Sequence, residues 1–238
     1  MLVEILKGNY TGRELLFIVL VTLFALTLSF SIHEFMHAAV ATWLGDDTPG
    51  YMGRLTLNPG AHLDPVGTLC ILLLGFGWGK PVVFNPNKLT RFKSKRLMRI
   101  LVSLAGVFGN FMLALIASII MTIVGAKIGF NVFNTSNGLS MMLVLVYLHQ
   151  FSLGLLAFNL LIIPPLDGFH VLEELIPIKV KYSNFWSSFC TIGPRVLTVL
   201  ILVGSMTGVH VLSYIVVWIE MPFEFIIQLI CNLLWSIL

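Results

Sequence analysis

Apolar stretches long enough to cross a membrane constrain this chain more than any other feature of its sequence. A helix needs about 20 apolar residues to cross a hydrocarbon core roughly 30 Å thick. Five segments meet or approach that length: Leu15–Leu44, Ile100–Val124, Ser140–Ile163, Val196–Val217 and Phe223–Leu238. Only 11% of the residues are charged, against about 25% in soluble domains, and the mean hydropathy is +0.96. The sequence therefore predicts an all-α polytopic membrane protein with about five transmembrane helices.

A sixth apolar stretch, Val66–Phe76, is too short to cross. Its eleven residues give about 17 Å of helix. A turn-rich sequence follows and leads into Val82-Val83-Phe84. We expect a re-entrant segment with a short β element over Gly75–Phe84. Because this segment does not cross, the first helix and the Ser140 helix run toward the same membrane face, and we predict that the N-terminus lies outside.

Basic residues cluster in one loop. Seven of the fourteen Lys and Arg residues lie between Lys80 and Arg99. Between apolar segments, such a cluster indicates a cytoplasmic loop, and no nucleic-acid motif accompanies it. We expect an integral, multi-pass protein of the cell membrane with this loop on the cytoplasmic side. The three cysteines, Cys70, Cys190 and Cys231, are far apart and are expected to be buried small apolar residues rather than a disulfide framework or a zinc cluster.

The first predicted helix carries a His-Glu-x-x-His pattern, His33-Glu34-Phe35-Met36-His37. Two histidines four residues apart lie on one helical face, so their imidazoles can converge on one metal ion. Glu34 can act as a general base toward a water on that ion, whose pKa zinc lowers to about 7. A five-residue match is weak by itself, but three ionisable residues inside an apolar span indicate a functional site. The alternative is a structural His–Glu pair at a helix interface.

A catalytic zinc usually has three protein ligands and one open position. The candidates for the third ligand are His62, Asp64, His149, Asp167 and His170. We favour Asp167, because Pro164-Pro165 ends the preceding helix and Gly168 permits a close backbone approach. The alternative for Asp167 is an N-cap of the next helix. For Asp64 we favour shaping of the turn before Pro65, and for His149 a hydrogen bond to a neighbouring helix.

These motifs, taken with three others, resemble the site-2 protease family of intramembrane zinc metalloproteases. The matching segments follow the family's order from His33 to Gly168, a little over half of the chain: His33–His37, Gly53–Pro59 (GRLTLNP), His62–Thr68 (HLDPVGT), Gly77–Val82 (GWGKPV) and Asn159–Gly168 (NLLIIPPLDG). The chain resembles the compact branch without a PDZ or CBS domain. This implies one metalloprotease domain over residues 1–238, with a catalytic core at about 13–176 and additional helices at about 190–238.

The resemblance implies roles for individual residues. His33, His37 and Asp167 would bind Zn²⁺, and Glu34 would activate the water that cleaves a peptide bond of a transmembrane substrate within the lipid bilayer. The re-entrant β element would present an edge to that substrate by strand addition.

Asn110 and Asn159 are the substrate-binding candidates. For Asn159 a hydrogen bond between helices is an equally good interpretation. Asn110 ends Ala105-Gly106-Val107-Phe108-Gly109-Asn110, where the family has Ala-Gly-Pro-x-x-Asn, and Ile162 replaces another family proline. These departures affect local helix geometry and substrate gating rather than the metal ligands.

Two other functions fit the polar residues. A metal or proton transporter would use the same side chains for conduction and would need further polar residues along other spans. A catalytically silent membrane scaffold would be expected to lack at least one of the four key residues, and all four are present. The sequence therefore favours an intramembrane zinc endopeptidase, and leaves its substrate and oligomeric state open.

Overall fold

The computed structural model describes residues 11–74, 77–129, 136–207 and 211–238. Within these ranges, five helices are long and apolar enough to cross a membrane. They are α2 (Gly12–Trp43), α6 (Lys95–Ile128), α7 (Ser136–Asn159), α10 (Asn184–Thr207) and α11 (Val211–Ile237). The predicted all-α polytopic membrane architecture is confirmed at this level.

The bounds of the last two helices differ from the prediction. We expected spans at Val196–Val217 and Phe223–Leu238, but α10 begins at Asn184 and α11 continues without a break through Pro222. Proline is tolerated inside apolar helices because neighbouring groups can satisfy the backbone carbonyl that it frees. Pro222 was therefore a poor guide to a helix end.

Five short helices complete the described fold: α3 (Thr48–Tyr51), α4 (Pro59–His62), α5 (Pro65–Leu74), α8 (Asp167–Leu175) and α9 (Ile178–Lys181). The α5 helix has ten residues, which agrees with the expectation that this stretch is too short to cross.

The predicted β element is wrong for the part of it that the structure describes. Residues 75–76 lie outside the described ranges, and residues 77–84 contain no strand. One isolated antiparallel bridge joins Leu63 and Gly79, and the Lys80 amide donates to the His62 carbonyl at 2.7 Å. The pairing goes no further because Pro81 has no amide hydrogen and the Val82 amide donates to a side chain, Glu34.

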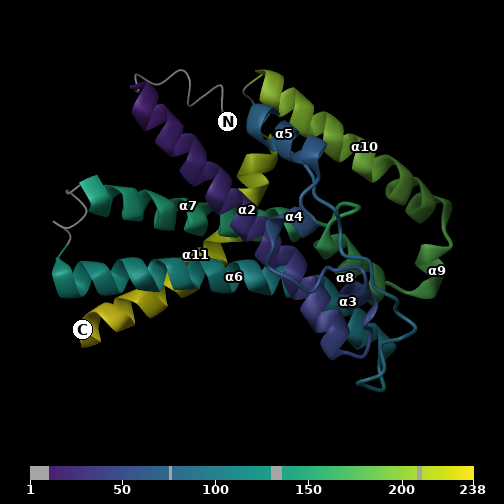
Figure 1. Cartoon of the computed structure of the whole chain (residues 1–238). Coiled ribbons are helices and arrows are strands. Elements are labelled where there is room, and N and C mark those ends of the chain that lie inside the picture. The colour runs from purple at the N-terminus through teal and green to yellow at the C-terminus, as the bar shows by residue number, and fades with distance from the viewer. Residues whose placement is uncertain (1–10, 75–76, 130–135, 208–210) are drawn as a thin grey trace.

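The helices α2, α6 and α7 form the centre of the molecule. In Figure 1, α6 and α7 lie alongside each other and α2 crosses them diagonally. Apolar side chains pack between these helices, including Ala25, Ala117 and Leu148. The helix α11 packs on α6 and α7 through Ile227, whereas α10 lies at the periphery (Figure 1). The last turns of α2 and the segment after α7 thereby meet beside the first turns of α6.

A salt bridge fastens α8 to α6. The Arg99 guanidinium donates to both carboxylate oxygens of Glu174, at 2.7 Å each. This hydrogen bond lowers the pKa of Glu174, while partial burial raises it by less. Because α8 begins at Asp167, the salt bridge holds the helix that carries the candidate third ligand.

We predict that Glu174→Gln lowers the free energy of unfolding by at most about 1 kcal/mol at neutral pH, since solvent screens this partly exposed salt bridge. The lowered pKa means that the stabilisation is present above the unfolded-state pKa of about 4.3 and is lost as pH falls through the folded-state value. Thermal unfolding in detergent at pH 7 and pH 3.5 tests this. The difference between wild type and variant should be smaller at the lower pH, and Glu173→Gln is the matched control. If Glu174→Gln were destabilised relative to wild type by the same amount at both pH values, this role would be contradicted.

Candidate metal centre

Three side chains from two distant parts of the chain converge on one point. The Nε2 atoms of His33 and His37 lie 3.1 Å apart. The Oδ2 atom of Asp167 lies 3.2 Å from His33 Nε2 and 3.3 Å from His37 Nε2. Both histidines are buried on α2, and the Asp167 carboxylate is 15% exposed. The structure therefore brings together the three residues predicted as ligands, with one donor atom of each facing the other two.

The geometry fits a zinc ion. Donors bound at 2.0–2.2 Å to a tetrahedral ion lie roughly 3.3–3.6 Å apart, close to the separations seen here. Asp167 Oδ2 is buried and accepts no hydrogen bond. Burial raises the pKa of the Asp167 carboxyl, but His37 and His33 lower it by more, so it lies well below its usual range. An ionised carboxylate and two imidazole nitrogens are ligands that zinc prefers.

The helix α6 orients both imidazoles. The Val102 carbonyl accepts a hydrogen bond from His37 Nδ1 at 2.7 Å, which leaves the lone pair of Nε2 facing the other donors. On the same helix, the side-chain amide of Asn110 lies 3.1 Å from His33 Nδ1. Asn110 is fully buried, and its Oδ1 atom has no hydrogen-bond partner. A half-turn of this amide would let Oδ1 accept from His33 Nδ1 and free His33 Nε2 in the same way.

Two glycines allow the backbones to approach. A Cβ atom at Gly106 would collide with the imidazoles of His33 and His37, and one at Gly168 would collide with the Leu160 carbonyl. Gly106 thus leaves room for both histidines against α6. Gly168 brings the start of α8 against the end of α7, which turns Asp167 toward α2.

Glu34 lies beside this group. Its carboxylate is buried in a side chain only 8% exposed, and its Oε2 atom accepts a hydrogen bond from the Val82 amide at 3.0 Å. The loop after α5 therefore fixes one oxygen of the carboxylate. The other oxygen has no hydrogen-bond partner among the described residues.

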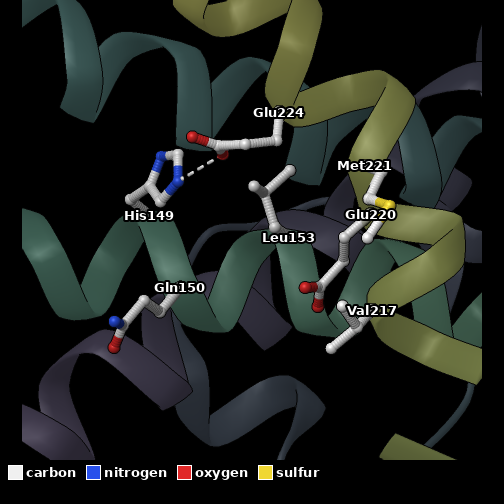
Figure 2. Close-up of a pocket in the computed structure, with 7 residues that line it drawn as sticks. All are labelled: His149, Gln150, Leu153, Val217, Glu220, Met221 and Glu224. Carbon is white, nitrogen blue, oxygen red and sulfur yellow. Dashed lines mark hydrogen bonds and ion pairs between the residues drawn. The ribbon is translucent and has the colours of Figure 1, made fainter. Parts of the chain in front are cut away.

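The remaining sequence candidates lie elsewhere. The Asn159 amide donates to the Leu155 carbonyl within α7, and His62 is buried with its Nε2 atom 2.7 Å from the Thr56 carbonyl. Asp64 accepts from the Gly67 amide, as expected for a residue that shapes a turn. His149 is hydrogen-bonded to neighbouring helices, as predicted: it lies 2.8 Å from Ser118 on α6 and 2.9 Å from Glu224 on α11 (Figure 2). His170 is exposed, and its Nδ1 atom lies 3.7 Å from a carboxylate oxygen of Glu173.

Sequence reasoning missed several partners. The backbone contacts of Val82 and Val102 have no signature in the sequence. Glu220 and Glu224, however, are ionisable residues inside an apolar segment, and the criterion that singled out His33 would have found them. Glu224 lies 2.9 Å from His149.

Fold and site together define a multi-pass membrane protein with a buried His-His-Asp group that can hold a metal ion. Over 156 residues the chain is 43% identical to the Bacillus subtilis (strain 168) protein named "Putative zinc metalloprotease YwhC", a match that covers 66% of this chain and 69% of that protein. The chain therefore belongs to the zinc metalloprotease family that this relative represents. No family model and no solved structure matches the chain.

We predict that Gly106→Ala weakens zinc binding at least tenfold, because the added methyl group displaces both imidazoles. Gly154→Ala is the matched control, since it makes the same change in a membrane helix where the nearest atom is an ordinary 3.7 Å away. Competition with a chromophoric zinc chelator measures both affinities. Equal affinity in the two variants would show that the α2–α6 approach does not shape the site.

Proposed function

We propose that this protein is an intramembrane zinc metalloendopeptidase of the site-2 protease type, which hydrolyses peptide bonds of transmembrane substrates. The observation that carries the proposal is the convergence of His33, His37 and Asp167 within an apolar helix bundle, with Glu34 beside them. The relative's name supports zinc-dependent proteolysis. The position of the donor group within α2, well beyond its first turns, supports a substrate that is embedded in the membrane.

In this proposal, His33, His37 and Asp167 hold the zinc ion. When bound, zinc acts as a Lewis acid and lowers the pKa of a coordinated water to about 7. Glu34 accepts the proton from the attacking water and delivers it to the leaving amine. The Val82 amide keeps the carboxylate oriented for this transfer through one oxygen, which leaves the other oxygen to face the water.

Asn110 contributes through His33 rather than through the substrate. Its contact with the Nδ1 atom of His33 supports a role in fixing the imidazole tautomer, since such partners of metal-bound histidines set ring orientation. Asn159 remains a candidate for binding the substrate. Its side chain is partly exposed near the end of α7, and a rotamer change would release it from the Leu155 carbonyl.

The clustered basic residues support an orientation of the protein in the membrane. The basic loop between Lys80 and Arg99 precedes and enters the first turns of α6, on the side of the molecule where the donor group lies. With this loop on the cytoplasmic side, the active site of a cell-membrane protein opens toward the cytoplasm. The physiological substrate is then a transmembrane or membrane-anchored protein whose helix unwinds near the site.

We predict that Glu34→Gln lowers cleavage by at least 10²-fold, the range expected for loss of a general base, while zinc content stays unchanged. The test uses proteoliposomes that contain the purified chain and a model single-span protein with a Gly-Pro pair in its span. Mass spectrometry of the products locates the cleaved bond.

Glu14→Gln is the matched control, because Glu14 lies on the same helix but is exposed at its first turn. Substantial cleavage by Glu34→Gln would exclude the proposed role of Glu34. Products cut only outside the span would contradict intramembrane hydrolysis.

The same vesicles test the transporter alternative. A second polar cluster at His149 and Glu224 is the kind of feature that the alternative requires. Zinc or proton uptake that depends on His33, in vesicles without protease activity, would favour transport over hydrolysis.

A further inference from the structure

The loop between α5 and α6 is attached to carboxylates of α2 and its C-terminal extension at two places. At the first, the Val82 amide donates to Glu34 Oε2 at 3.0 Å. At the second, three residues further along the loop, the Asn85 amide donates to Asp46 Oδ2. Asp46 follows the end of α2 at Trp43 by three residues. The same loop therefore contacts the candidate general base and a second carboxylate at the end of the helix that carries it.

Asp46 is a fully buried carboxylate, with an exposed fraction of 0%. Its Oδ1 atom accepts hydrogen bonds from the backbone amide and the hydroxyl group of Thr48, and its Oδ2 atom accepts from the Asn85 amide. A buried carboxylate is costly, but only a carboxylate can accept hydrogen bonds at both of its terminal atoms. Hydrogen bonds to an ionised group are also stronger than those between neutral groups. Asp46 is thus a strong and specific attachment point for the loop.

The segment between the two attachments is short and stiff. Only two residues separate Val82 from Asn85, and a proline flanks each end, Pro81 and Pro86. Proline fixes its own φ angle and favours an extended conformation in the residue before it. Between them, Phe84 packs against buried apolar side chains from the end of α2 and the start of α6. A displacement of Asn85 therefore shifts Val82 as well.

The later part of the loop is held independently of Asp46. The Leu44 carbonyl accepts hydrogen bonds from the amides of Thr90 at 2.9 Å and Arg91 at 3.2 Å. Leu89 is fully buried between α2 and α6. Because these contacts persist without Asp46, its loss is expected to release residues 82–85 while the rest of the loop stays in place.

We propose that Asp46 is a positioning residue for Glu34. By holding Asn85, it keeps the Val82 amide on one oxygen of the Glu34 carboxylate and so leaves the other oxygen directed toward the water. The inference rests on the proposed function of Glu34 as the general base. The hydrogen bonds of Asp46 are with Thr48 and Asn85, so it acts on Glu34 through the loop. A misplacement of about 1 Å in a catalytic group can cost about 10²-fold in rate.

Hydrogen exchange at single amides tests this linkage without any activity measurement. Two variants break the contact from opposite sides: Asp46→Ala removes the acceptor, and Asn85→Pro removes the donor amide. In each zinc-loaded variant in detergent, we expect the Val82 amide to exchange at least tenfold faster than in wild type. The amides of Thr90 and Arg91 should keep their wild-type rates. A wild-type exchange rate at Val82 in either variant would overturn the proposal.

A double variant tests whether the effect passes through Glu34. Glu34→Ala removes the acceptor of the Val82 amide, so it should speed exchange at Val82 as much as Asp46→Ala does. Glu34→Ala combined with Asp46→Ala should exchange no faster than either single variant, because both changes remove the same hydrogen bond. Additive effects at Val82 would show that Asp46 acts by another route and would overturn the proposal.

Cleavage in proteoliposomes separates positioning from a purely structural role. Asp46→Ala and Asn85→Pro should each lower kcat at least tenfold, with KM and zinc affinity within twofold of wild type. Loss of zinc binding, or a kcat per zinc-loaded molecule equal to that of wild type, would contradict positioning of Glu34.

Asp47→Ala is the matched control. It makes the same change at the adjacent residue, whose side chain is exposed and forms no capping hydrogen bond with α3, and it should keep the wild-type exchange rate and kcat. A wild type that cleaves no membrane substrate would refute the proposed function. The exchange rates at Val82 would then still decide whether Asp46 holds the loop against Glu34.

Discussion

The close approach of α2 to α6 at Gly106 is the constraint on which the site depends. Because Gly106 has no side chain, the imidazoles of His33 and His37 lie directly against α6. From that position His37 reaches the Val102 carbonyl and His33 reaches Asn110. One helix thus provides both the space for the two histidines and the hydrogen bonds that orient them. Asp167 completes the group at the start of α8, which lies against the end of α7.

Membrane burial explains why the buried polar groups of the site need partners. An unpaired polar or ionised group inside an apolar bundle is costly. Glu34 is held by the Val82 amide, and His37 by a backbone carbonyl. Asp167 Oδ2, by contrast, accepts no hydrogen bond and faces two imidazole nitrogens. An uncompensated oxygen in such a place is what a metal-binding site requires.

Much of this arrangement could be predicted from the sequence. Segment length gave five spanning helices, and the His-Glu-x-x-His pattern identified the histidine face of α2. A Val66 segment that does not cross, which we preferred for its length and because it lets the site assemble, is consistent with Asp167 meeting that face, and the structure places Asp167 there. These predictions succeeded because helix periodicity and span length are local properties of the chain.

Other features could not be predicted, for physical reasons. The β element was expected from apolar residues near Val82, but strand pairing depends on a partner, and the amide of that residue donates to Glu34 instead. The bounds of α10 and α11 were misplaced because proline inside an apolar helix does not end it. The contacts of Asn110 and Gly106 with the histidines arise from how α2 crosses α6, and no local pattern encodes a crossing.

The most direct test of the central claim is the zinc content of the purified protein. Mass spectrometry after metal-replete purification in detergent should find about one zinc per chain in wild type, and little or none in His37→Ala and in Asp167→Ala. His170→Ala should keep its zinc, because His170 is an exposed histidine near Asp167 that does not face the other donors. A wild type without metal, or an Asp167→Ala variant that holds zinc as tightly as wild type, would contradict the assignment of the site.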